Sequence, residues 1–138
     1  MYKRQLQDRK ITVLGLAFKP GTDDMRESPS IPIVKALAEA GATITAYDPI
    51  AAEEAQKLFA DIPMKYADTV VEAVAGADAI VLVTRWEEFE DLPIIINGMD
   101  VAPLLIDGRR MIPRDAVPRY EGIGLSVTAS PEPLAEAS

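Results

Sequence analysis

The sequence predicts an α/β protein with a mostly parallel sheet. Two observations lead to this prediction. Short apolar runs, typical of strands that are buried on both faces, recur along the chain. Between them lie segments whose apolar residues have helical spacing. Alternation of this kind implies right-handed crossovers, and the expected architecture is therefore a Rossmann-like three-layer αβα sandwich.

The first half of the chain contains two predicted strands and two predicted helices. Residues 10–16 (KITVLGL) form a nearly continuous apolar run, as expected of a central strand. Ser28 is the expected cap of a helix that starts with prolines suited to a first turn and ends at Gly41. Residues 42–47 (ATITAY) have the β-branched alternation of a second strand, and a helix is expected over residues 51–59.

The second half repeats the pattern. A short helix is expected over residues 68–74, followed by a fully apolar strand over residues 78–84 (DAIVLVT). Residues 104–107 (LLID) predict another short strand, and a last one is expected near residues 123–127. The tail, residues 128–138, is rich in Ala, Ser, Pro and Glu and is expected to be disordered.

The length and charge of the chain limit its organisation and partners. A chain of 138 residues suits one domain, which we expect over residues 10–127 after a lead-in of residues 1–9. With 14 Lys and Arg against 22 Asp and Glu, the net charge of -8 repels nucleic acid. The sequence shows neither a membrane-spanning run nor the apolar core of a secretory signal, so we expect a cytoplasmic protein with no membrane partner.

The sequence contains no cysteine and no histidine. It therefore lacks a thiolate nucleophile, an imidazole base and the ligands that zinc prefers. Covalent acyl chemistry and catalytic triads are excluded. The remaining Lys, Arg, Asp, Glu and Tyr side chains are better suited to holding an anion than to breaking bonds unaided.

The segment of residues 15–28 (GLAFKPGTDDMRES) is much longer than an ordinary βα connection of about 2 to 6 residues. It follows the first predicted strand, and ligands of open α/β sheets bind outside the carboxyl ends of the strands. Its glycines, lysine, arginine and paired aspartates suit a binding loop. A plain connection remains the alternative, and the absence of GxGxxG argues against a standard dinucleotide site.

Three segments that follow predicted strands should converge on one edge of the sheet. They are the loop of residues 15–28, the cluster of residues 85–89 (RWEEF) and the turn of residues 108–110 (GRR). Lys19, Arg26 and Arg109 could surround a phosphorylated ligand there, because arginine offers a planar fork that matches phosphate oxygens. The N-terminus of the helix after the loop would add unpaired N–H groups.

Several polar residues near this edge could either bind a ligand or have only a structural role. Asp23 and Asp24 could ligate a divalent cation, but such a pair also suits a solvated turn or an arginine partner, and we expect no metal. Asp48, at the end of the second strand, could hold a ribose diol or cap the turn before Pro49.

The sequence also leaves the roles of two aromatic residues and of one arginine near this edge undecided. Trp86 and Phe89 could stack on a base or sugar, or pack as a lid or interface. We expect Arg110 to be a solvated or salt-bridged neighbour of Arg109, because adjacent side chains in an extended segment point opposite ways.

The run GLAFKPGTDDMRESPS, the strand end AYDP, the segment VTRWEEF and the later IDGRR occur in that order. Together they closely resemble the C-terminal, UDP-binding domain of the UDP-glucose 6-dehydrogenase and GDP-mannose dehydrogenase family. The resemblance spans approximately residues 10–125. The MRESPS form and the W-x-x-F cluster are most similar to the bacterial UDP-glucose 6-dehydrogenases.

The resemblance implies an enzyme that oxidises the C6 alcohol of UDP-glucose to a carboxylate in two NAD-dependent hydride transfers. It also implies roles for individual residues. Phe18 and Lys19 would contact the UDP-sugar, Arg109 would contact its nucleotide or sugar portion, and Arg26 would face the NAD held by another domain.

The chain departs from the family in what it lacks. Family members are longer, with an N-terminal NAD domain, a connecting helix that forms a homodimer, and a catalytic cysteine. We therefore expect no catalytic residue here and no turnover by the chain alone. The alternatives are a non-catalytic nucleotide-binding or oligomerisation module, an independent NAD-binding domain, or the equivalent domain of a GDP-mannose or UDP-N-acetylhexosamine dehydrogenase.

Overall fold

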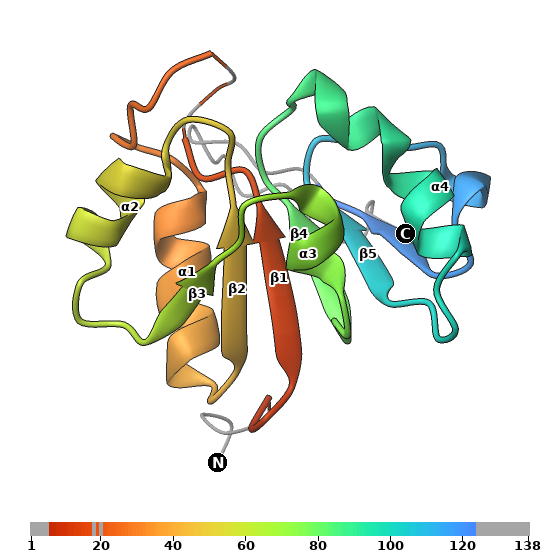
Figure 1. The fold of residues 1–138 in the computed structure, drawn as a ribbon, viewed down its shortest axis with the longest axis horizontal. Coiled ribbons are helices and arrows are strands. Elements are labelled where there is room, and N and C mark those ends of the chain that lie inside the picture. The colour runs from red at the N-terminus through yellow and green to blue at the C-terminus, as the bar shows by residue number, and fades with distance from the viewer. Residues whose placement is uncertain (1–5, 18, 20, 124–138) are drawn as a thin grey trace.

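The computed structural model describes residues 6–17, 19 and 21–123, which form a parallel sheet covered by helices on both faces (Figure 1). In chain order the strands are β1 (Lys10–Leu14), β2 (Thr43–Tyr47), β3 (Met64–Tyr66), β4 (Ala79–Leu82), β5 (Leu104–Asp107) and β6 (Tyr120–Gly122). Their order in the sheet is β3-β2-β1-β4-β5-β6, and every neighbouring pair is parallel. The predicted α/β fold is confirmed. The strand order reverses between β1 and β4, which makes this crevice the topological switch point.

The helices lie in two layers. Those of the described residues are α1 (Ser30–Glu39), α2 (Ala52–Leu58), α3 (Val70–Val74) and α4 (Leu92–Asn97), with the 3₁₀ helices η2 (Glu87–Asp91) and η3 (Arg114–Ala116). One apolar cluster joins the sheet to α1 and α2, and a second joins it to α3 and α4.

Side chains along β1 point alternately to the two faces of the sheet, and both faces are covered, which explains why the strand is a continuous apolar run. Ile11 and Val13 belong to the cluster under α1 and α2, whereas Leu14 belongs to the cluster under α3 and α4. Thr12 is also buried, and its hydroxyl donates a hydrogen bond of 2.6 Å to the carbonyl of Ala73 in α3. Both faces of the strand are covered, as expected of a central parallel strand.

The start of the long loop differs from the prediction. The first strand ends at Leu14 and not at residue 16, because Gly15 adopts a positive φ of 93° that turns the chain out of the sheet. Ser28 is not the cap of α1. The N-cap is Pro29, whose side chain has no acceptor for a cap hydrogen bond. The Ser28 hydroxyl lies one residue earlier, where it donates to the carbonyl of Leu16 and accepts from the N–H of Ser30.

The last strand of the described residues begins earlier in the chain than the predicted strand of residues 123–127. β6 occupies Tyr120–Gly122, where Tyr120 pairs with Leu105, and Ile123 only donates its N–H to the carbonyl of Asp107. The position of this strand in the sequence is therefore determined by its pairing with β5 and not by a local run of apolar residues. Residues 124–127 of the predicted strand and the predicted disordered tail lie outside the described residues.

Candidate functional site

The long loop leaves the sheet in close contact with the end of β4. A Cβ atom on Gly15 would lie 2.4 Å from the Cβ of Thr84 and 2.6 Å from its backbone nitrogen, so only glycine fits there. The hydroxyl of Thr84 then donates a hydrogen bond of 2.8 Å to the carbonyl of Ala17. The first residues of the loop therefore lie across the switch point between β1 and β4.

Two buried serines bring the end of the loop back to its start. The hydroxyls of Ser28 and Ser30 each donate to the carbonyl of Leu16 at 2.7 Å, and Ser28 Oγ also accepts from the N–H of Ser30 at 3.1 Å. Both serines are almost fully buried. The loop is thus closed at its base, with the N-terminus of α1 held against the end of β1.

Asp48 is a structural anchor for this edge. Its buried carboxylate accepts hydrogen bonds of 2.8 to 3.3 Å from five N–H groups. The donors are the backbone groups of Leu16, Ala17, Ile50 and Ala51 and the indole of Trp86. Since five donors saturate a carboxylate, a ribose diol has no acceptor here. The capping alternative for Asp48 is correct.

The cluster that follows β4 bends back over the ends of β1 and β2. The Tyr47 hydroxyl donates to the Glu88 carboxylate at 2.9 and 3.2 Å, and burial, followed by this hydrogen bond, raises the pKa of Tyr47 to about 12. Phe89 is fully buried, and its ring meets that of Tyr47 edge to face with centroids 6.1 Å apart. Phe89 therefore packs in the core, whereas Trp86 stays partly exposed at the edge.

Arg109 is positioned by the end of β5. Its backbone N–H donates to the fully buried carboxylate of Asp107 at 3.0 Å, and its Nε donates to the carbonyl of Val83 at 2.8 Å. The side chain therefore crosses from β5 to the end of β4. Because Thr84 follows Val83 and anchors Ala17, Arg109 and the base of the loop meet at the same crossover.

The other predicted site residues lie at different places. Lys19 is exposed, two residues beyond the anchored Ala17, and Phe18 lies outside the described residues. Arg26 is further out on the loop, with its side chain 88% exposed. Its guanidinium forms a bidentate pair with Asp24, in which Nε and Nη2 lie 3.0 and 2.9 Å from the two carboxylate oxygens.

Of the alternatives considered for Asp24, the structure shows the one in which it pairs with an arginine. The side-chain hydrogen bonds from Arg26 are the main cause that lowers the pKa of Asp24 to about 2. Among the described residues, no three acidic side chains gather as a metal site would require. No helix in the same part of the chain is long and apolar enough to cross a bilayer.

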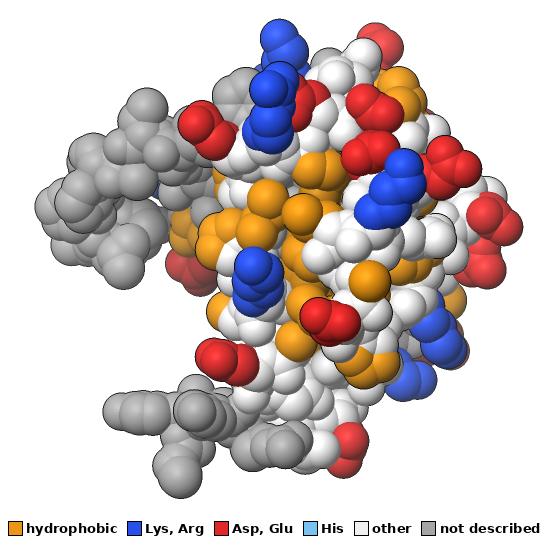
Figure 2. Space-filling view, turned by 90° about the vertical axis from the view of Figure 1, so that its left-hand side faces the viewer, with side chains coloured by type: hydrophobic (Ala, Val, Ile, Leu, Met, Phe, Trp, Pro, Cys, Tyr) orange, Lys and Arg blue, Asp and Glu red, His pale blue; other side chains and the backbone are white. Residues whose placement is uncertain are grey.

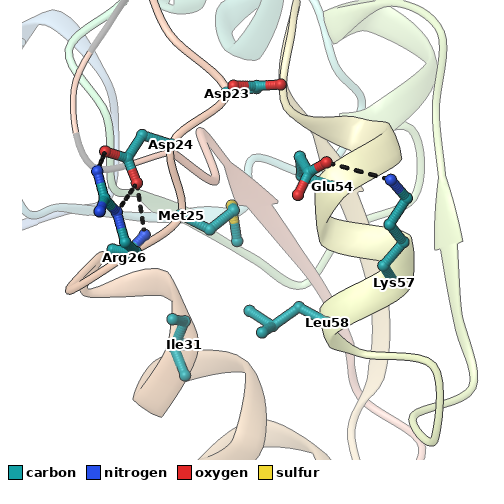
Figure 3. Close-up of a pocket in the computed structure, with 8 residues that line it drawn as sticks. All are labelled: Asp23, Asp24, Met25, Arg26, Ile31, Glu54, Lys57 and Leu58. Carbon is teal, nitrogen blue, oxygen red and sulfur yellow. Dashed lines mark hydrogen bonds and ion pairs between the residues drawn. The ribbon is translucent and has the colours of Figure 1, made fainter.

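A wide hollow of about 910 Å³ lies between the outer part of the loop and α2 (Figure 3). Met25, Ile31 and Leu58 point toward its middle, while the Asp24–Arg26 and Glu54–Lys57 pairs stand on opposite sides. Figure 2 shows hydrophobic side chains gathered on this side of the molecule among scattered charges. The residues lining the hollow include Arg26 but neither Lys19 nor Arg109.

Sequence reasoning did not single out Thr84 and Ser30, which shape the loop. Their hydrogen-bond partners lie 67 and 14 residues away along the chain. At Thr84, the only indication in the sequence is a hydroxyl side chain shortly after an apolar strand. No feature of the residues around Ser30 indicates that its hydroxyl bonds to the carbonyl of Leu16.

Comparison with known proteins identifies the kind of domain. Residues 12–114 match the family model described as "UDP-glucose/GDP-mannose dehydrogenase family, UDP binding domain". The chain belongs to this family. The UDP-glucose 6-dehydrogenase AglM of Haloferax volcanii is 43% identical over 118 residues, and the UDP-glucose 6-dehydrogenase of Rhizobium meliloti is 44% identical over 124 residues. The resemblance seen in the sequence is therefore confirmed.

The UDP-binding domain is similar to only a part of these relatives. The alignments cover 86% of this chain but 27% and 28% of the H. volcanii and R. meliloti proteins. The fold agrees with a solved structure of a UDP-glucose dehydrogenase from Pyrobaculum islandicum, with a TM-score of 0.73 and 31% identity over 88% of this chain and 26% of that one. The match to dehydrogenases thus concerns one domain.

Proposed function

We propose that this UDP-binding domain binds UDP-glucose at the switch point and serves, within a longer NAD-dependent UDP-glucose 6-dehydrogenase, to present the nucleotide sugar for oxidation to UDP-glucuronate. One observation carries the proposal. The hydrogen bonds from Arg109 to Val83 and from Thr84 to Ala17 bring two cationic segments to a single crossover. Ligands of open α/β sheets bind at this place.

The proposed contacts follow from the positions of the side chains. Lys19 is exposed next to the anchored base of the loop and offers a point charge, whereas Arg109 is held through its Nε by the carbonyl of Val83 and through its backbone N–H by the carboxylate of Asp107. Both suit the phosphates of a nucleotide sugar. Phe18, next to Lys19, is proposed to contact the same ligand, and Arg26 to face NAD from the outer part of the loop.

The proposed role of this chain is binding and orientation without catalysis. Oxidation of an alcohol to a carboxylate transfers two hydrides to an acceptor and takes up one water, and in this family the resemblance implies that a cysteine forms the aldehyde adduct that loses the second hydride. NAD would act as the hydride acceptor, held mainly by another domain. The chain has no cysteine for the adduct, and it is therefore proposed to be inactive alone.

Calorimetric titration of the chain with UDP-glucose tests the proposal. We expect saturable binding, and we expect Lys19→Met to weaken it about 10- to 100-fold, because a hydrogen bond to a charged group contributes roughly 1.5 to 3 kcal/mol. Lys35→Met removes an equally exposed cation from α1 and serves as the matched control. Lack of binding at millimolar ligand by the folded chain, or equal losses in both variants, would contradict the proposal.

The same titration addresses the identity of the sugar nucleotide. The family description includes GDP-mannose as well as UDP-glucose. We expect UDP-glucose to bind more tightly than GDP-mannose, as the relatives named UDP-glucose 6-dehydrogenase suggest. The reverse preference would assign the domain to a different branch of the family.

A further inference from the structure

A buried carboxylate holds the turn that carries Arg109. Asp107 ends β5, is fully buried, and accepts three hydrogen bonds within the described part of the chain. Two come from the backbone N–H groups of Arg109 at 3.0 Å and of Ile112 at 2.7 Å. The third comes from the hydroxyl of Tyr120 at 3.0 Å. Since a carboxylate only accepts hydrogen bonds, its position depends on these donors.

The turn contains a backbone conformation that arginine rarely adopts. The N–H of Arg109 bonds to the side chain of the residue two positions earlier, which makes an Asx turn. Arg110 then has a φ of 53°, in the left-handed region where glycine is the usual residue. Such a conformation persists only when its surroundings over-determine it. The hydrogen bonds to Asp107 from residues on both sides of Arg110 supply that constraint.

The direction of the Arg109 side chain depends on the same turn. Its Nε donates to the carbonyl of Val83, directly after β4, at 2.8 Å. Its backbone N–H is held by Asp107 at the end of β5. A shift of the Asp107 carboxylate would therefore move the backbone from which the guanidinium extends. A binding side chain is held in a precise geometry only when the groups behind it are themselves held.

Tyr120 reaches Asp107 along the edge strand β6. In the pairing of β6 with β5, Tyr120 lies opposite Leu105 and Gly122 lies opposite Asp107. A Cβ atom on Gly122 would lie 3.0 Å from the Tyr120 hydroxyl and 3.1 Å from its Cε2. The phenol ring therefore lies over Gly122, in space that a side chain at position 122 would crowd. An aromatic ring that covers a glycine on an edge strand also helps to fix the register of that strand.

The phenol of Tyr120 is also held from the side of η3. The guanidinium carbon of Arg114 lies 5.4 Å from the centroid of the ring, within the range of a cation–π contact. Burial, followed by the hydrogen bond to Asp107, raises the pKa of Tyr120 to about 12. The hydroxyl therefore keeps the proton that it donates to Asp107 throughout the neutral pH range.

We propose that Tyr120 is a positioning residue for the nucleotide-sugar site: through Asp107 it holds the turn that carries Arg109, and so sets the direction of the guanidinium. The inference rests on the proposed function, in which Arg109 contacts the nucleotide sugar. Tyr120 acts at a distance from the ligand, through one carboxylate. Gly122 has a part in the same arrangement because it leaves room for the phenol.

The exchange of the Arg109 Nε proton with water tests the inference on the whole chain without a ligand. The hydrogen bond to Val83 slows this exchange, which NMR measures. We expect Tyr120→Phe to accelerate it about threefold or more, because the turn loses one of its supports. Tyr66→Phe is the control. It removes a phenol hydroxyl from β3, at the opposite end of the strand order from β6, and should leave the exchange unchanged.

Calorimetric titration with UDP-glucose measures the effect on binding. We expect Tyr120→Phe to weaken binding about fivefold in the wild-type background but less than about twofold in the Arg109→Met background. A general loss of stability would weaken binding equally in both backgrounds, so a difference identifies an effect that passes through Arg109. Tyr66→Phe should leave the affinity unchanged, and urea unfolding shows whether each variant is folded.

A second variant keeps the hydroxyl and displaces the ring. In Gly122→Ala the added methyl group would crowd the phenol of Tyr120, so the ring must shift. We expect faster exchange of the Arg109 Nε proton and weaker binding of UDP-glucose, as in Tyr120→Phe.

The outcomes for the inference and for the proposed function are distinguishable. If the wild type binds UDP-glucose, then unchanged Nε exchange in Tyr120→Phe, or equal weakening of binding in both backgrounds, would overturn the inference and leave the proposed function standing. Accelerated exchange in Tyr120→Phe without binding of UDP-glucose by the wild type would reject the proposed function, while the hold of Tyr120 on Arg109 would stand.

Discussion

Individual polar side chains hold the carboxyl edge of the sheet by bonding to its backbone. Thr84 holds Ala17, Ser28 and Ser30 hold Leu16, and Asp48 holds the start of the loop and the start of α2. In the described part of the chain, every buried side-chain nitrogen or oxygen has a hydrogen-bond partner. Because these partners are backbone atoms, the geometry of the edge is set before a ligand arrives.

The contact between Gly15 and Thr84 can be tested by adding one methyl group. We expect Gly15→Ala to lower the free energy of unfolding by about 2 to 4 kcal/mol, because the new Cβ would overlap Thr84 and the backbone has a positive φ. Urea unfolding measures this change.

Gly21→Ala is the matched control. Gly21 has a similar positive φ of 85°, but no described atom lies within 4 Å of the added Cβ. The expected loss is therefore only the backbone strain of about 1 kcal/mol. Equal losses in the two variants would show that the approach of Gly15 to Thr84 is not close.

Sequence patterns indicate which segments meet at this edge, whereas the roles of single residues there stay predictions. The segments of Lys19 and Arg109 each follow a strand, and the parallel topology brings them to one edge. Whether Asp48 holds a ligand or a turn was open, because its partner Trp86 lies 38 residues away and depends on the path of the chain after β4. Such contacts cannot be inferred from neighbouring residues.

At the scale of elements, the sequence predicts the strands at the centre of the sheet but neither β3 nor α4. The strand over residues 104–107 was placed with its observed bounds. By contrast β3 has only 3 residues, none of them fully buried, and α4 has only 6 with a proline in its first turn. Neither segment is long enough for its apolar residues to show a strand or helix periodicity, so each depends on pairing or packing with the rest of the fold.

Two tyrosine hydroxyls connect elements at this edge and predict a dependence of stability on pH. Tyr47 links β2 to η2 through Glu88, and Tyr120 links β6 to the end of β5 through Asp107. Burial raises the pKa of each phenol to about 12 from an ordinary value of 10. A raised folded-state pKa gives stability that is fully present below pH 10 and is lost as the pH rises toward 12.

Chemical unfolding at several pH values tests this prediction. At pH 8 we expect Tyr47→Phe to be less stable than the wild type, and we expect the difference to shrink between pH 10 and pH 12. Tyr66→Phe should show a smaller narrowing, because burial is the cause that raises the pKa of Tyr66 and its hydroxyl has no hydrogen bond in the described part of the chain. A difference for Tyr47→Phe that stays constant up to pH 12 would show that the phenol is not held as described.

At the scale of the whole molecule, the domain has two distinct surfaces beside its long loop. The switch point carries Arg109 and the anchored base of the loop, whereas the hollow beside α2 has an apolar middle and carries Arg26. The chain spans about a quarter of the length of its relatives. Under the proposed function, the nucleotide sugar binds at the switch point and the outer part of the loop contacts NAD.

The most direct measurement of this assignment is the change in backbone amide NMR shifts when UDP-glucose is added to the chain. The account predicts that the largest changes cluster at the carboxyl edge, in residues 15–17, 84–86 and 108–110. Changes confined to the hollow, at Met25, Glu54 and Leu58, or to the opposite edge of the sheet, would contradict it.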